Sequence, residues 1–170
     1  MMCIKDKDGY SISGDYYSDE FKYLQVKLLK CNPINSQVPC KDPSSLDAFF
    51  SPKQFQFAFV NSYFDALSYA DPIKQFLDDS IFFQLETQRD KKADLYVMKG
   101  AVEMEDDYVH LGQFQEEEFP QVQTIRFYED SVAQDNALVS IYIRYDQKGI
   151  FYRRETYSIL DFLADIGGVQ

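Results

Sequence analysis

The chain has 170 residues, of which 45% are hydrophobic and 16% are aromatic, and this composition excludes a disordered protein and suits one domain with a sizeable core. Its 28 acidic residues against 17 Lys and Arg give a net charge of -11, which makes nucleic acid an unsuitable partner because acidic chains repel phosphate backbones. The 15 Phe and 13 Tyr favour strands, and the scarcity of Gly and Pro argues against long flexible linkers.

The first twenty residues are polar and contain Gly9 and Gly14, so we expect residues 1–20 to form an arm with turns. The sequence shows no signal-peptide pattern, because Met1 to Ile4 are followed at once by charged residues. It also has no apolar run of about 18 residues, the length that a membrane-spanning helix needs.

Residues 21–30 alternate between apolar and polar side chains and predict a strand that leads into a short loop. Cys31 and Cys40 enclose this loop, NPINSQVP, whose prolines and asparagines favour a turn that brings its ends together. We expect a disulfide here, which would indicate an oxidising compartment; two reduced cysteines are the alternative. Cys3 is left without a partner in the chain and is expected to pair, if at all, outside it.

A short helix is predicted after the loop, with Asp42 as its N-cap and Pro43 at the first helical position. The next stretch, residues 54–63, has the clearest strand pattern, with Phe55, Phe57 and Phe59 on the face expected to point into the core. Residues 64–80 are expected to be a mixed connection with a helical turn near Pro72. Strands are then predicted at 81–87 and 93–104, joined as a hairpin by the polar residues 88–92.

An acidic stretch follows from Glu103 to Glu118, without any Lys or Arg. Carboxylate oxygens suit calcium or magnesium, so weak metal candidates are Glu105, Asp106, Asp107, Glu116, Glu117 and Glu118. Their spacing matches no metal-binding motif, and a solvated charged face is the alternative. His110 is the only histidine and has no catalytic motif around it.

The C-terminal third predicts three further strands, at 122–129, 137–145 and 150–157. Residues 146–149 are expected to form a hairpin turn with Gly149 at positive φ. The fold class is therefore α+β, mostly β, with a largely antiparallel sheet or sandwich of about seven strands and two or three short helices. Residues 21–157 are expected to be a single β-rich domain.

The last residues, 158–170, predict a short amphipathic helix from Ser158 to Asp165 that leads toward a membrane segment beyond the sequence. Ile166, Gly167 and Gly168 are the expected membrane junction, because glycines let a chain turn sharply into a bilayer.

The tail carries a pattern made of Arg154, Tyr157, Leu160, Leu163, Ala164, Ile166, Gly167 and Gly168. In this pattern and over nearly its whole length, the chain resembles the extracytoplasmic domain of ciliate two-pass transmembrane proteins, in which a related tail leads into the second membrane helix. Leu163 to Gly168 alone is similar to the segment before the second membrane helix of amiloride-sensitive and acid-sensing channels. The resemblance implies a membrane-anchored architecture and no particular activity.

No catalytic or cofactor motif is complete, so the sequence predicts a non-enzymatic domain without a cofactor, outside the cell or in a lumen. It would bind a partner protein or form a structural subunit of a membrane assembly, with a homo-oligomer as one form of that assembly. Exposed tyrosines are the expected contacts: Tyr16, Tyr17, Tyr142 and Tyr152. The alternatives are the ectodomain of a cation channel or transporter subunit and a carboxylate-based hydrolase.

Overall fold

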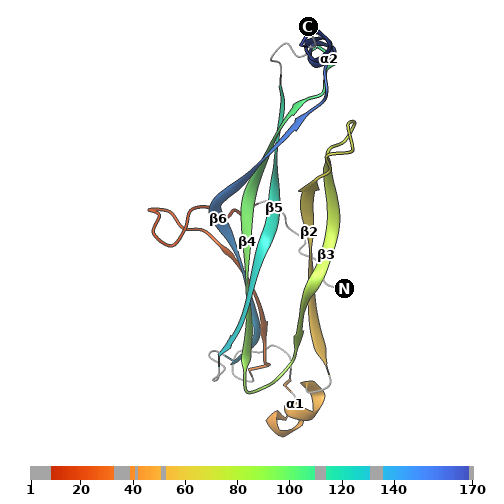
Figure 1. Ribbon diagram of the computed structural model, residues 1–170. Helices are drawn as coiled ribbons and strands as arrows, with labels where there is room; N and C mark the ends of the chain where they lie inside the picture. The colour runs from red at the N-terminus through yellow and green to blue at the C-terminus, as the bar shows by residue number, and fades with distance from the viewer. Residues whose placement is uncertain are drawn as a thin grey trace.

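The computed structural model describes residues 9–32, 39–40, 42–50, 53–109, 114–130 and 136–168. Its strands are β1 (Leu24–Leu29), β2 (Gln54–Phe64), β3 (Ile73–Gln84), β4 (Asp90–Glu105), β5 (Gln115–Asp130) and β6 (Ala137–Glu155). Its helices are α1 (Pro43–Phe50) and α2 (Ile159–Gly167), which lie at opposite ends of an elongated molecule (Figure 1).

Two sheets face each other. One has four strands in the order β1-β6-β4-β5, and the other is the β2–β3 hairpin alone. All pairs are antiparallel except β4 with β6, which run parallel. The predicted class, mostly β with a largely antiparallel sheet and two short helices, is confirmed.

The main core lies between the two sheets and follows from the alternation of side chains along the strands. Phe55, Phe57 and Phe59 of β2 pack on it, as predicted, against a buried cluster from β3, β4 and β6 that includes Ile81, Leu95 and Ile141. A second, smaller cluster of Val102, Met104 and Phe119 lies nearer to α2 and packs against Phe64, Ile73 and Tyr152.

One buried side chain fastens the hairpin to the edge of the large sheet. The amide of Asn61 on β2 accepts the Val122 N–H at 2.9 Å and donates to the Val122 carbonyl at 2.8 Å. Asn61 thus satisfies both backbone groups of one residue on the edge strand β5, which would otherwise lack strand partners.

The structure corrects the expected connections. Residues 73–80 belong to β3 and contain no helical turn, and β3 and β4 lie in different sheets, so residues 88–92 do not close a hairpin. Residues 137–155 are one strand instead of two, and Gly149 does not have the expected positive φ. Residues 146–148 form an outward bulge in β6, because three residues stand opposite Met98 alone.

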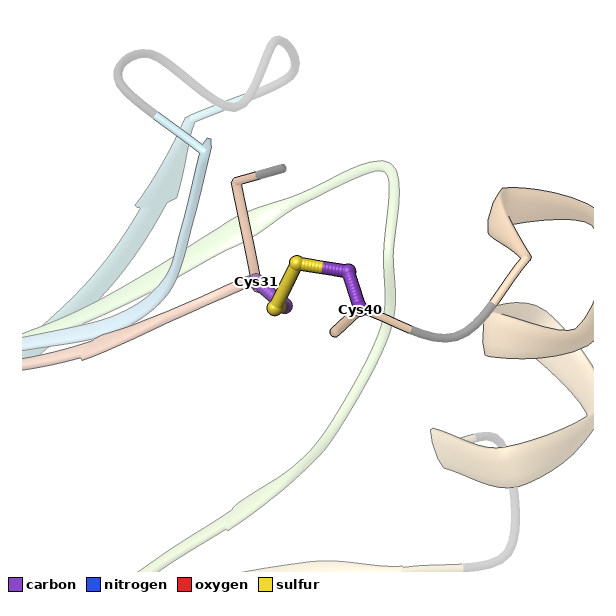
Figure 2. Close-up of a disulfide and its surroundings, with 2 residues drawn as sticks. All are labelled: Cys31 and Cys40. Carbon is purple, nitrogen blue, oxygen red and sulfur yellow. A yellow bond between two sulfur atoms is a disulfide. The ribbon is translucent and has the colours of Figure 1, made fainter. Parts of the chain in front are cut away.

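The described part of the N-terminal arm folds back on the segment before β1, where Ser13 and Lys22 form an antiparallel bridge. Gly14 has φ +65°, and a side chain there would overlap the carbonyl oxygen of Glu20, so the arm needs glycine to turn back toward β1. Cys31 and Cys40 are joined in a disulfide with their Cα atoms 5.6 Å apart, which ties the end of β1 to the segment before α1 (Figure 2). The predicted helix start at Pro43 is confirmed.

Candidate interaction surface

The start of helix α2 is set by a complete capping box. The Ser158 hydroxyl accepts the Asp161 N–H at 3.1 Å, and the Asp161 carboxylate accepts the Ser158 N–H at 2.9 Å. Two N–H groups that a helix start leaves unpaired are therefore satisfied. The predicted amphipathic helix is confirmed, although it continues two residues further, to Gly167.

The apolar side chains of α2 cover no part of the domain. Ile159, Phe162, Leu163 and Ile166 follow the i, i+3, i+4, i+7 spacing of one helix face, and each is between 51% and 57% exposed. Leu160 widens this face and is also 51% exposed, and α2 has no buried residue. We call these five residues the α2 apolar face. Exposed apolar patches of this kind are found at interaction sites of proteins.

Helix α2 is attached to the domain by backbone contacts at its base. The Ile159 N–H donates to the Tyr108 carbonyl at 2.8 Å, and the Thr156 N–H donates to the Glu105 carbonyl at 3.1 Å. On the polar side of the helix, the Tyr157 hydroxyl donates to the Asp165 carboxylate, and this hydrogen bond raises the pKa of the Tyr157 phenol. The helix is therefore oriented by its base and its polar side, and its apolar face remains available.

Below α2, the buried side chain of Arg154 joins three parts of the fold. Its guanidinium donates to both carboxylate oxygens of Asp106, to the Ser68 carbonyl at 2.9 Å and to the Ala66 carbonyl at 3.3 Å. It also lies 4.5 Å from the ring centroid of Tyr69. Arg154 thus ties the end of β6 to the end of β4 and to the tip of the β2–β3 hairpin.

The acidic stretch does not come together as a metal site among the residues that the structure describes, where no group of three or more His, Cys, Asp or Glu could hold a metal ion. Its members are dispersed: Asp106 is paired with Arg154, Glu118 with Lys99, and Glu105 is buried. Glu116, Glu117 and Asp107 are exposed to solvent. The expectation of a solvated charged face fits most of these positions, and His110 lies outside the described residues.

The expected tyrosine contacts divide into two kinds. Tyr16 and Tyr17 are 81% and 93% exposed and are free to meet a partner. Tyr152 is half-buried, lies between the rings of Phe64 and Phe119 and donates to Gln121, so it serves the second core. Tyr142 is also half-buried, 5.0 Å from the guanidinium of Arg144. Cys3 lies outside the described part of the chain.

The expected membrane junction does not contain a sharp turn. Gly167 is the last residue of α2, and Gly168 has φ -78° and ψ 0°, with its N–H bonded to the Ala164 carbonyl at 2.9 Å. Both glycines thus follow the helix direction instead of reversing it. None of the described helices is long and apolar enough to cross a membrane.

The charges of α2 help to choose among possible surroundings for its apolar face. The helix carries Asp161 and Asp165 and no Lys or Arg. Helices that lie in a cytoplasmic membrane surface are usually rich in Lys and Arg, because the lipid headgroups of that leaflet are often anionic. Helix α2 lacks these residues, and amphipathic helices also dock in apolar grooves of other proteins.

Comparison with known proteins places the chain in one family. The family described as "Uncharacterised 80 kDa protein N-terminal domain" matches residues 1–146. Because this match covers most of the 170 residues, the chain belongs to that family. No curated protein and no solved structure matches the chain. The matched region includes β1 to β5 and half of β6, and it stops short of α2.

Proposed function

We propose that this member of the 80 kDa protein N-terminal domain family is a non-enzymatic, extracytoplasmic domain of a membrane-anchored protein, and that it binds a partner protein through the α2 apolar face. The single observation that carries the proposal is that all five large apolar side chains of a capped helix are at least 51% exposed. A helix of nine residues gains little stability by itself, so its apolar stripe is expected to be covered when the protein is in its natural assembly.

The α2 apolar face is large enough to contribute substantially to the free energy of binding a partner protein. Phe162 is 53% exposed, and covering its exposed half, roughly 100 Å², contributes about 2.5 kcal/mol by area. Leu163 lies beside it and is 56% exposed. Placing a carboxylate at position 163 would bury an unpaired charge in the contact, so Leu163→Asp is expected to weaken binding by at least about 100-fold.

The extracytoplasmic location is supported by the Cys31–Cys40 disulfide, because such bridges persist mainly in oxidising compartments. Mass spectrometry of the protein purified from its natural source without reductant tests this part of the proposal. A linked peptide containing both cysteines is expected, and free thiols at both positions would contradict an extracytoplasmic location.

The partner contact is tested by photocrosslinking in living cells. A benzophenone amino acid replaces Phe162 in one variant and Tyr17 in a second, and both positions are exposed. We expect position 162 to crosslink to a partner protein and position 17 to crosslink weakly or not at all. The purified partner should then bind the wild-type chain and lose at least about 100-fold in affinity for Leu163→Asp.

The Tyr17 variant is the matched control, because it carries the same reactive group on a tyrosine of the N-terminal arm that is more exposed than Phe162, at 93% against 53%. Crosslinks from position 17 alone would move the contact to that arm and contradict the proposal. Crosslinks from position 162 to lipid would show that the α2 apolar face contacts a membrane surface, and they would contradict the proposal of a protein partner. A crosslinked dimer of the chain would identify the partner as a second copy.

A further inference from the structure

Two bulges in the large sheet lie at the same level, one on each side of β4. In β5, Gln123 is an extra residue, because Thr124 stands opposite Tyr96 and Val122 stands opposite Val97. In β6, residues 146–148 stand opposite Met98 alone. Bulges redirect side chains and are frequent beside binding sites.

The two bulges border an open groove of about 450 Å³. Tyr96 and Met98 of β4 line it, together with Thr124 and Arg126 of β5 and with Asp146 and Lys148 of β6, so the charged side chains of the lining are two cations and one acid. This volume falls in the range of clefts that bind small ligands. The groove is separate from α2, so its role does not depend on the function proposed for that helix.

Two cations line the groove without a carboxylate partner among the described residues. Arg126 lies with its guanidinium carbon 5.0 Å from the ring centroid of Tyr96, which is its ring contact. The acid opposite Arg126 in the sheet is Asp94, but Asp94 is held by Arg144 at 3.3 Å and by the Tyr128 hydroxyl at 3.4 Å.

Lys148, on the β6 side of the groove, likewise forms no ion pair with a carboxylate of the described residues. The nearest acid in its own bulge is Asp146, whose carboxylate accepts the Lys148 backbone N–H at 3.1 Å and forms no ion pair with its ammonium group. Lys99, opposite Gly149 at the same level of the sheet, is by contrast paired with Glu118 at 2.6 Å. In a protein of net charge -11, a groove whose charged lining is two cations and one acid, with neither cation in an ion pair with a described carboxylate, is locally positive.

We propose that this groove binds a carboxylate side chain from an acidic segment of a partner protein. The planar guanidinium of Arg126 presents two parallel N–H donors to a carboxylate, and the Lys148 ammonium adds charge from the opposite wall. The Tyr96 ring holds the guanidinium in place, and Gln123 and Thr124 supply neutral polar groups beside it. The surrounding negative charge of the protein restricts binding to a ligand that reaches these two cations directly.

The test uses the complete 170-residue chain, labelled with ¹⁵N, in nuclear magnetic resonance titrations. The probe is a blocked hexaglutamate peptide, and the control probe is the blocked hexaglutamine peptide of the same length. We expect saturable shifts of the amides of residues 96, 123–126 and 146–149 and of the Arg126 Nε–H with the glutamate peptide only.

The variants Arg126→Gln and Lys148→Gln are each expected to weaken this binding by at least about tenfold, because each removes one of the two charges that hold the carboxylate. Lys27→Gln is the matched control, because Lys27 is an exposed lysine on β1, outside the groove. Unchanged spectra away from the substitution show that each variant is folded.

The proposal is overturned if the glutamate peptide produces no saturable shifts at the groove, or if Arg126→Gln and Lys148→Gln bind it as well as the wild type does. Saturation of the same amides by inorganic phosphate, with no response to the glutamate peptide, would also overturn the carboxylate assignment. A loss of binding in Lys27→Gln equal to that in Arg126→Gln would show a diffuse charge effect and not a site.

Discussion

Replacing Arg154 with methionine tests the contribution of the Arg154 hydrogen-bond network to the stability of the fold. Methionine keeps the unbranched apolar stem of the side chain, but it removes the paired hydrogen bonds to Asp106 and the donors to the Ser68 and Ala66 carbonyls. The Arg154 side chain is 6% exposed and that of Asp106 is 21% exposed, so the variant leaves a carboxylate that water reaches only in part.

Removing one partner of a buried ion pair costs about 3–5 kcal/mol, and the partial exposure of Asp106 places this case near 3 kcal/mol. We therefore expect Arg154→Met to lower the free energy of unfolding by about 3 kcal/mol. The measurement is urea denaturation followed by far-ultraviolet circular dichroism. Adding Asp106→Asn to Arg154→Met should recover part of the loss, because it removes the unpaired charge.

Arg153→Met is the matched control one residue away. Arg153 pairs with Glu155 at 3.4 Å, and both side chains are about half exposed, so its removal should cost less than about 1 kcal/mol. If Arg154→Met costs no more than Arg153→Met, the network around Arg154 does not hold the hairpin to the sheet, and the reasoning is refuted.

Three other predictions concern single contacts. Asn61→Ala leaves the N–H and carbonyl of Val122 without their partner and should cost about 2–3 kcal/mol in urea denaturation; a cost below about 0.5 kcal/mol would show that water replaces the clamp. Ser158→Ala removes the N-cap and should destabilise α2 by about 1 kcal/mol, seen as faster amide hydrogen exchange in residues 159–167 with the sheet unchanged. The hydrogen bond from Lys91 holds the pKa of Glu129 below its ordinary value of 4.5, so the contribution of Glu129 to stability is present above that value and is lost as the pH falls through the folded-state pKa. Glu129→Gln should therefore lose less stability than the wild type between about pH 6 and pH 3, and equal acid sensitivity of the two proteins would contradict this account.

Local sequence signals predicted the elements that depend on short-range chemistry. The alternation of Phe55, Phe57 and Phe59 identifies β2 and its core face, because side chains of a strand alternate between two sides. Asp42 followed by Pro43 marks the start of α1, and Ser158 marks the start of α2. Each of these signals lies within five consecutive residues.

The errors arise where distant strands decide the local structure. Residues 146–149 have the polar and glycine composition of a turn, but β4 pairs with β6 on both sides of them and makes them a bulge in one strand. In β3, a register shift opposite Phe57 to Phe59 disturbs the alternation that would have revealed the strand at 73–80. The parallel contact between β4 and β6 has no sequence signal at all.

The candidate sites were predictable to different degrees. The amphipathic pattern of α2 was visible in the sequence. The exposure of its apolar side chains could not be predicted, because it depends on whether another element of the fold covers them, and none of the described elements does. The groove between the bulges was missed, because Tyr96, Arg126 and Lys148 come from three strands and meet only in the folded sheet. Arg154 was singled out only through a resemblance, and its buried network follows from the three-dimensional structure.

Amide hydrogen exchange of α2 in the natural assembly tests the central claim most directly. Residues 159–167 should exchange rapidly in the isolated 170-residue chain, because a nine-residue helix without buried side chains opens readily. In the protein extracted with its partners intact, we expect the same amides to exchange at least about 100-fold more slowly, since a covered apolar face adds several kcal/mol to the cost of opening. Equal exchange of residues 159–167 in both preparations, with the sheet equally protected in both, would show that nothing covers the α2 apolar face and would contradict its proposed role as the docking surface.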